Sequence, residues 1–179
     1  MLRACAQIIA PIPTPLPPNT VLSQRLACEA SDVFVAVASV AGVVELQPGG
    51  VTGLQTCNAS YAASSRRVSV LDVHGLKDDV VPINGDALLG FPPVLDVEPS
   101  NMRNWAWRNS CSGAPTQTFT NGTFSNLRWA QCGADGSAEV EIVLNSVGVH
   151  EWPAPTSAFD TTSYVVDWLL RAAARRRVA

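Results

Sequence analysis

Three short runs of apolar, mostly β-branched residues constrain the fold of this chain more than any other feature. They are VFVAVASVAG at 33–42, VSVLDV at 68–73 and EVEIVL at 139–144. The first two are apolar almost without interruption, which is typical of strands buried on both faces of a parallel sheet. Helix-like patterns occur around these runs, at 21–30, 98–109 and 160–174. Strands that alternate with helices predict an α/β fold with a mostly parallel sheet and flanking helices.

Local signals add detail to this prediction. Residues 117–131 alternate loosely around Asn121-Gly122, a dipeptide that predicts a small β-hairpin inserted between the parallel strands. Asp160 precedes the last helical pattern and suits the N-cap position, where a carboxylate accepts hydrogen bonds from free backbone N–H groups. A further short helix is predicted to begin at Asp86.

The two ends of the chain differ from the rest. Residues 1–20 contain prolines at 11, 13, 15, 17 and 18, which disfavour both helix and central strand, so this segment is predicted to be an extended arm. Its apolar run at 6–10 is too short for the hydrophobic region of a secretory signal peptide. At the other end, residues 172–179 form a basic tail, which we interpret as the solvated end of the last helix.

Composition excludes several classes of protein. Hydrophobic residues make up 47% of the 179 residues and charged residues 15%, as in globular domains. The net charge of −3 does not indicate a nucleic-acid partner. No apolar stretch approaches the length of about 18 residues that a membrane span needs. Neither a metal nor another cofactor is predicted, because two distant histidines and no Cys-x-x-Cys provide no ligand spacing, and no Gly-x-Gly-x-x-Gly occurs.

The two histidines both lie just past predicted strands. His74 closes the run at 68–73, and Asp78 and Asp79 follow it within five residues. His150 follows the run at 139–144. Because ligands and catalytic groups gather beyond the carboxyl ends of parallel strands, a carboxylate and an imidazole in these two loops fit an acyl-transfer site. A strand-end histidine is also often structural, and the pattern alone leaves both interpretations open.

Five ordered strings make the acyl-transfer interpretation more specific. They are LSQRLACEASDVFVAVASVAG, VSVLDVHGLKDDVVPINGD, NWAWRNSCSG, GVHEWP and FDTTSYVVDWLLR. Together they resemble the C-terminal part of the polyhydroxybutyrate depolymerase and feruloyl esterase group of secreted α/β-hydrolases. The resemblance implies that Asp78 is the triad acid and His150 the triad base. It also implies that Trp152 and Pro153 shape the loop behind this base and that His74 is structural. Because Trp152 stands beside His150 in the sequence, it is the tryptophan that we expect to touch substrate.

The nucleophile of that group has no counterpart here. The group carries G-x-S-x-G-G before the helix that ends in L-A-C, and Pro17 stands at the place of the serine. The serines Ser23 and Ser39 are expected to belong to a helix face and a buried strand. We therefore expect residues 21–171 to be a partial α/β-hydrolase domain, its C-terminal half, and the chain as written to be inactive. An incomplete gene model would explain the missing elbow.

The resemblance also implies a secreted protein with disulfides at Cys28–Cys57 and Cys111–Cys132. Cys5 is left over in the arm. In a cytosolic protein all five cysteines would instead be reduced and buried. Two further sequence motifs, at Asn58 and Asn121, match the N-glycosylation acceptor and suit an extracellular location.

Two functions follow from these observations. The first is a carboxylic ester hydrolase that acts on an ester polymer or a feruloylated polysaccharide when the missing half completes it. The second is a non-catalytic secreted module that binds a polymer or a partner through tryptophan-bearing loops. Trp105 and Trp168 have helical spacings and are predicted to lie in the core rather than in such a groove.

Overall fold

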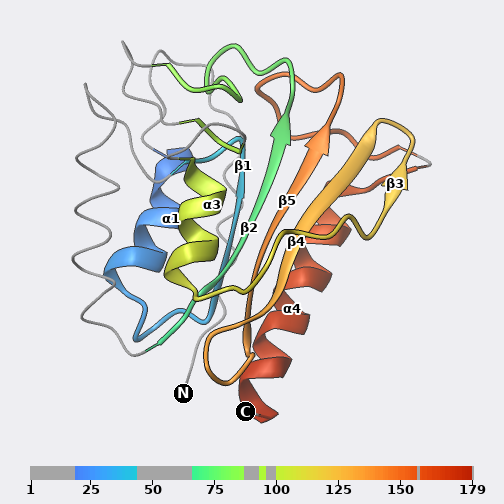
Figure 1. Cartoon of the computed structure of the whole chain (residues 1–179). Coiled ribbons are helices and arrows are strands. Elements are labelled where there is room, and N and C mark those ends of the chain that lie inside the picture. The colour runs from blue at the N-terminus through green and yellow to red at the C-terminus, as the bar shows by residue number, and fades with distance from the viewer. Residues whose placement is uncertain (1–18, 44–65, 87–92, 96–99, 157, 179) are drawn as a thin grey trace.

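One open sheet organises the chain. The computed structural model describes residues 19–43, 66–86, 93–95, 100–156 and 158–178. In these residues, five strands lie in the order β1-β2-β5-β4-β3 (Figure 1). Their bounds are β1 Ala36–Val40, β2 Ser69–Gly75, β3 Thr120–Asn121, β4 Phe124–Cys132 and β5 Ala138–Asn145. The first, second and fifth strands run parallel, whereas β4 pairs antiparallel with β5 and with β3.

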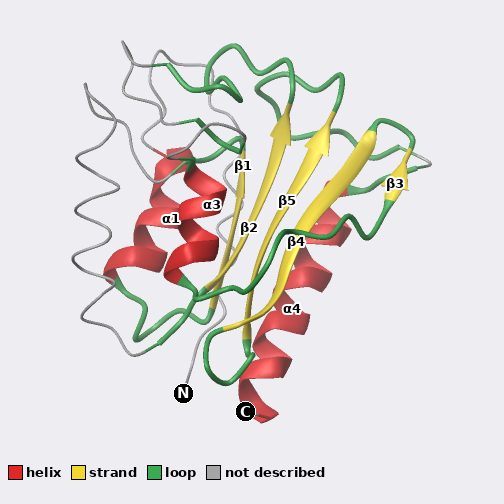
Figure 2. Ribbon diagram, in the orientation of Figure 1, coloured by secondary structure: helices red, strands yellow, loops and turns green. Residues whose placement is uncertain are grey.

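Helices cover both faces of this sheet. Figure 2 shows α1 (Asn19–Glu29) and α3 (Asn101–Arg108) on one face and α4 (Thr161–Val178) on the other. This arrangement confirms the α/β class. The expected hairpin forms at Asn121-Gly122, but it is not a separate insertion, because β4 pairs along the length of β5 and extends the sheet.

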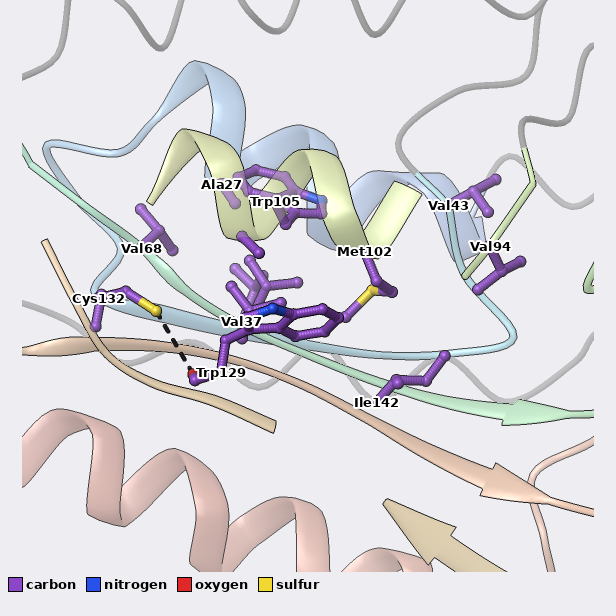
Figure 3. Close-up of a cluster of buried hydrophobic side chains, with 14 of the residues drawn as sticks. Ala27, Val37, Val43, Val68, Val94, Met102, Trp105, Trp129, Cys132 and Ile142 are labelled. Atoms are coloured by element: carbon purple, nitrogen blue, oxygen red, sulfur yellow. Dashed lines mark hydrogen bonds between the residues drawn. The ribbon is translucent and has the colours of Figure 1, made fainter. Parts of the chain in front are cut away.

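Two apolar cores lie against the opposite faces of the sheet. Neighbouring residues of a strand point to opposite faces, so Val70 packs toward α1 and α3 while Leu71 packs toward α4. Trp105 fills the first core, beside Met102, Trp129 and Ile142 (Figure 3). Trp168 fills the second. Both indoles at predicted core positions are fully buried, and burial of such a side chain stabilises the fold by about 2–3 kcal/mol.

The predicted elements differ from the observed ones mainly at their ends. The apolar run at 33–42 forms only β1, because Phe34 N–H donates to Ala30 O and so closes a turn after α1. Asp160 caps α4 as predicted, accepting from the backbone N–H groups of Thr162 and Ser163 at 2.9 and 3.2 Å. The helix predicted at 86–90 lies almost entirely outside the described residues.

The basic end of the chain is more ordered than a solvated tail. Helix α4 continues to Val178, beyond the predicted end at 174. Arg175 forms an ion pair with the buried carboxylate of Glu139, and Arg176 lies 3.4 Å from a carboxylate oxygen of Asp135. These contacts attach the last turns of α4 to β5 and to the turn before it. None of the described helices is long and apolar enough to cross a membrane.

A buried glutamine ties both helices of one face to the sheet. Gln24 of α1 is fully buried, and its Nε2 donates to Ser39 Oγ at 2.9 Å and to Gly42 O at 3.0 Å. Its Oε1 accepts from Asn101 Nδ2 at 2.9 Å and from Trp105 Nε1 at 2.8 Å. One side chain thus satisfies polar groups from β1, the turn after it, and α3.

This geometry predicts the effect of replacing Gln24. Gln24→Met keeps the length of the side chain but leaves buried partners without a hydrogen bond, each at a cost of about 1–3 kcal/mol. We expect urea unfolding at neutral pH to show that the free energy of unfolding falls by at least this amount. The same substitution at the exposed Gln117 is the control and should have little effect. Equal losses at the two positions would contradict the assigned role of Gln24.

Candidate functional site

The two predicted triad residues meet at one edge of the sheet. Strands β2 and β5 are parallel neighbours, so the loops that follow them emerge at the same edge. The first loop carries Asp78 and the second carries His150. His150 Nδ1 lies 3.0 Å from Asp78 Oδ2, although the residues are 72 positions apart in the chain. The structure therefore brings together the acid and the base that the sequence predicted.

Close backbone packing holds the two loops in register. A Cβ atom at Gly75, the last residue of β2, would overlap the carbonyl oxygen of Gly148. Because glycine has no such atom, the two loops approach closely enough for Lys77 N–H to donate to Gly148 O at 2.9 Å. Leu76 N–H donates to Asn145 O at 2.9 Å on the same side. These contacts fix the distance between the loops that carry Asp78 and His150.

Asp78 is held as an ionised acceptor. Its Oδ1 accepts from the backbone N–H groups of Val80 and Val81, at 2.9 and 2.8 Å. Burial by itself would raise the pKa of Asp78, but the hydrogen bonds from His150 and Val81 and the charges of His150 and His74 outweigh burial and lower this pKa. An ionised carboxylate can only accept, so His150 Nδ1 carries the proton and Nε2 is the ring atom left to take one.

His74 lies between two carboxylates, Asp72 and Asp78. It is buried, with Nδ1 2.9 Å from Asp72 Oδ2 and Nε2 2.8 Å from Val81 O. The same Nε2 lies 3.7 Å from Asp78 Oδ2, the oxygen that also contacts His150 Nδ1. Asp72 was not among the predicted site residues. A carboxylate inside an apolar strand, two residues before a histidine and thus on the same face, was the available signal.

Trp152 occupies a structural position. Its side chain is half-buried and packs against the core beneath α4. Its Nε1 donates to Thr162 Oγ1 in the first turn of that helix, at 3.1 Å. The neighbouring Pro153 is buried. The indole N–H therefore serves the attachment of the His150 loop to α4, and substrate contact by Trp152 stays a prediction.

No candidate nucleophile approaches the base within the described part of the chain. No described hydroxyl or thiol forms a hydrogen bond with His150 Nε2. Ser39 is buried in β1, as expected, Ser23 is buried on α1, and Cys28 is disulfide-bonded. Pro17, at the predicted place of the serine, lies outside the described residues.

The predicted disulfides can be tested in part. Cys111 and Cys132 form a disulfide that links the end of α3 to the end of β4, which confirms that pairing. Cys28 is also disulfide-bonded, whereas its predicted partner Cys57 and the unassigned Cys5 lie outside the described residues.

One of the two glycosylation motifs lies within the described residues. Asn121 is exposed in the hairpin turn, where its side-chain nitrogen donates to Ala158 O. A glycan on that nitrogen would alter this contact. Asn58 lies outside the described residues.

Exposed apolar side chains occur in the two loops that carry the acid–base pair. Leu76 and Val80 are close to Asp78 in sequence, in the loop after β2, and Val147 and Val149 are close to His150 in sequence, in the loop after β5.

A pocket also opens at the opposite end of the sheet, where β2 and β5 begin. It has a volume of about 460 Å³, and Arg67, Asp135 and Arg176 are among its lining residues. Strands of seven or eight residues place it roughly 20 Å from the Asp78–His150 pair. We assign no role to this pocket, since Arg176 already contacts Asp135 and Ser137. Among the described residues, no group of three or more His, Cys, Asp or Glu side chains could hold a metal ion.

No family model and no curated protein matches this chain. The class of the site follows from its own geometry, which is that of a carboxylate-oriented imidazole with one ring nitrogen available. Such a pair is a general acid–base device, and its chemistry depends on the group that Nε2 reaches.

The close approach of the two loops predicts the effect of a methyl group at Gly75. Gly75→Ala forces the loops apart, so we expect a loss of about 3 kcal/mol in the free energy of unfolding and displaced NMR signals of the His150 ring. Gly113 has open space around it, and Gly113→Ala is the control. That variant should lose some stability through its positive φ while the His150 signals stay in place. Unmoved His150 signals in Gly75→Ala would refute the positioning role.

The lowered pKa of Asp78 predicts an acid-sensitive contribution to stability. The ionised form stabilises the fold above the ordinary pKa of an aspartate, 3.8, and this contribution is lost as the pH falls through the lower pKa of Asp78 in the folded chain. Urea unfolding across this acidic range should therefore show a shallower decline for Asp78→Asn than for the unmodified chain. Asp79→Asn removes an exposed carboxylate next to it and should retain the full decline. Parallel curves for all three proteins would contradict the assignment.

Proposed function

We propose that this chain provides the acid–base part of a serine carboxylic ester hydrolase of the polyhydroxybutyrate depolymerase and feruloyl esterase kind. The observation that carries the proposal is the hydrogen bond between His150 Nδ1 and Asp78 Oδ2, at the carboxyl ends of two parallel strands. The proposed fold is the C-terminal half of an α/β-hydrolase, in which the acid and the base follow the nucleophile along the chain.

The proposed roles follow from where the protons sit. His150 Nε2 takes the proton of an incoming serine hydroxyl as its oxygen attacks the ester carbonyl, and then gives it to the departing alcohol. Water then attacks the acyl-serine while His150 Nε2 takes its proton. The acid leaves as His150 returns this proton to the serine oxygen. Asp78 remains ionised throughout, because two backbone N–H groups and the cation formed on His150 favour its charge. The serine and the oxyanion donors come from a segment that supplies a G-x-S-x-G-G elbow.

The apolar residues of the two loops support a substrate class. Leu76, Val80, Val147 and Val149 expose hydrocarbon surface in the loops that carry the pair. An acyl chain or an aromatic acyl group fits such a surface better than a charged one does, because its burial removes apolar area from water. We therefore propose an ester polymer or a feruloylated polysaccharide as substrate, and an extracellular location that suits the Cys111–Cys132 disulfide.

One observation favours the non-catalytic alternative. Trp107 on α3 has 71% of its surface exposed, and a solvent-facing indole is a common anchor for polymers and partners. Saturable binding to an insoluble polyester or polysaccharide that is lost in Trp107→Ala, together with no turnover by any completed enzyme, would support that function instead.

The ester hydrolase proposal predicts a gain of activity on completion. The chain as written should not hydrolyse p-nitrophenyl acetate or butyrate above the rate of buffer. A version in which a G-x-S-x-G-G elbow and its preceding strands replace residues 1–18 should hydrolyse both, with release of p-nitrophenol followed by absorbance. Robust turnover by the chain as written, abolished by His150→Ala, would show that it already holds a nucleophile.

Matched variants of the completed enzyme test the two roles. Asp78→Asn should lower kcat by about 10⁴-fold, the size found when the orienting carboxylate of a serine protease is removed. Asp79→Asn, which changes the exposed neighbour in the same way, should leave kcat unchanged. Equal effects of the two substitutions would contradict the proposed role of Asp78.

A further inference from the structure

The buried His74 has no part in the proton transfers described above, yet it lies against their carboxylate. We infer that His74 is held as an imidazolium cation at neutral pH and acts as a positioning residue that keeps Asp78 ionised beside His150. This inference deepens the proposed function and rests on it for the role of Asp78. The charge state of His74 rests on the geometry alone.

Two groups in this network have hydrogen-bonding roles that their chemistry fixes, the indole N–H of Trp105 and the backbone carbonyl of Gly42. An indole N–H can only donate, so the Gln24 atom that lies 2.8 Å from Trp105 Nε1 is the amide oxygen. The other amide atom is then a donor, and its contact with the carbonyl oxygen of Gly42 at 3.0 Å agrees with this. Gln24 Nε2 therefore also donates to Ser39 Oγ.

The hydroxyl proton of Ser39 also has a defined acceptor. Since Ser39 Oγ accepts from Gln24, its own hydrogen is directed to another acceptor. The closest is Asp72 Oδ1 at 2.6 Å, while Leu71 O lies at 3.3 Å. Asp72 Oδ1 also accepts from the backbone N–H of Gly42 at 3.1 Å. One oxygen of this buried carboxylate thus receives two donors, which favours its ionised form.

The ring nitrogens of His74 then have defined partners. The carbonyl oxygen of Val81 can only accept, so His74 Nε2 carries a proton. The proton between Nδ1 and Asp72 Oδ2 belongs on the imidazole, because a carboxyl group is the stronger acid and because Asp72 already receives two other donors. Both ring nitrogens are protonated, and the ring carries a positive charge.

The ionisable surroundings agree with this assignment. Burial alone would lower the pKa of His74, but the hydrogen bond and charge of Asp72, the hydrogen bond to Val81 and the charge of Asp78 outweigh it and raise this pKa. Asp72 and Asp78 are the ionisable groups that face the ring among the described residues, with His150 beyond Asp78. Among the described residues, the basic groups in contact with Asp78 are these two imidazoles.

The position of the charge explains its effect on the pair. His74 Nε2 lies 3.7 Å from Asp78 Oδ2, which makes this oxygen the meeting point of two imidazoles. A fixed cation there opposes protonation of Asp78. It also keeps Asp78 Oδ2 in place as the acceptor for His150 Nδ1. The Nε2 atom of His150 therefore remains the one that can act as the base.

The charge of His74 can be read by NMR on the full 179-residue chain. Two-bond ¹H–¹⁵N spectra of the histidine rings, recorded in steps from pH 5 to pH 9, distinguish one protonated nitrogen from two. We expect His74 to show both nitrogens protonated at pH 7 and above the range in which a free histidine titrates, near pH 6.5. Asp72→Asn should convert it to a neutral ring. A neutral His74 at pH 7 in the unmodified chain would overturn the inference.

The effect on Asp78 has its own readout. The Asp78 carboxyl ¹³C titration should move to higher pH in the double variant Asp72→Asn/His74→Gln, with proton affinity raised by about tenfold or more. The double variant exchanges a buried ion pair for a neutral hydrogen-bonded pair, which avoids leaving one buried charge alone. Lys77→Gln, which removes an exposed cation one residue before Asp78, is the control and should not move the titration. An unmoved titration in the double variant would reduce His74 to a structural role.

Failure of the ester hydrolase proposal and failure of the inference about His74 give different experimental results. Both NMR readouts use the chain without turnover, so they stand if the completed enzyme fails to hydrolyse esters. Conversely, an active completed enzyme with a neutral His74 would retain the ester hydrolase proposal and remove the positioning role.

Discussion

A buried polar network joins the core of this protein to its candidate site. Hydrogen bonds run from Trp105 Nε1 through Gln24 and Ser39 to Asp72 and His74. His74 Nε2 then lies 3.7 Å from Asp78 Oδ2, the oxygen that contacts His150 Nδ1. Each member is buried or nearly so, and each donor meets an acceptor. In a low-dielectric interior such a network specifies one arrangement, because an alternative would leave a polar group without a partner.

The network lies on one face of the sheet and leads to the edge that carries the site. Ser39, Asp72 and His74 lie on the strand face that α1 and α3 cover, where most other inward positions are apolar. Their polarity is tolerated because Gln24 and the turn after β1 supply partners. At the opposite face the buried Glu141 has a comparable arrangement, with donors from Asn126 and Trp168, yet it lies away from the strand ends and joins α4 to the sheet.

The sequence predicted those parts of the molecule that depend on local patterns. The runs at 68–73 and 139–144 became β2 and β5, the Asp160 cap formed, and Asn121-Gly122 turned the hairpin. The pairing of β4 along β5 was not predicted, since strand order is decided by contacts between distant segments. Asp72 had a local signal in the histidine two residues after it, but its contacts with Gly42 and with a serine 33 residues away join distant segments.

The site itself was predicted in position but only partly in its interactions. Strand-end topology was sufficient to place Asp78 and His150 in adjacent loops. The approach that closes the gap between them depends on the missing Cβ of Gly75 against the backbone at Gly148, which no local pattern announces. Because that contact and the buried network lie within this chain, its own residues hold Asp78 and His150 together. In the ester hydrolase that we propose, a serine at His150 Nε2 would need no rearrangement of Asp78, and preorganisation of this kind is how a carboxylate and an imidazole contribute to catalysis rather than to binding alone.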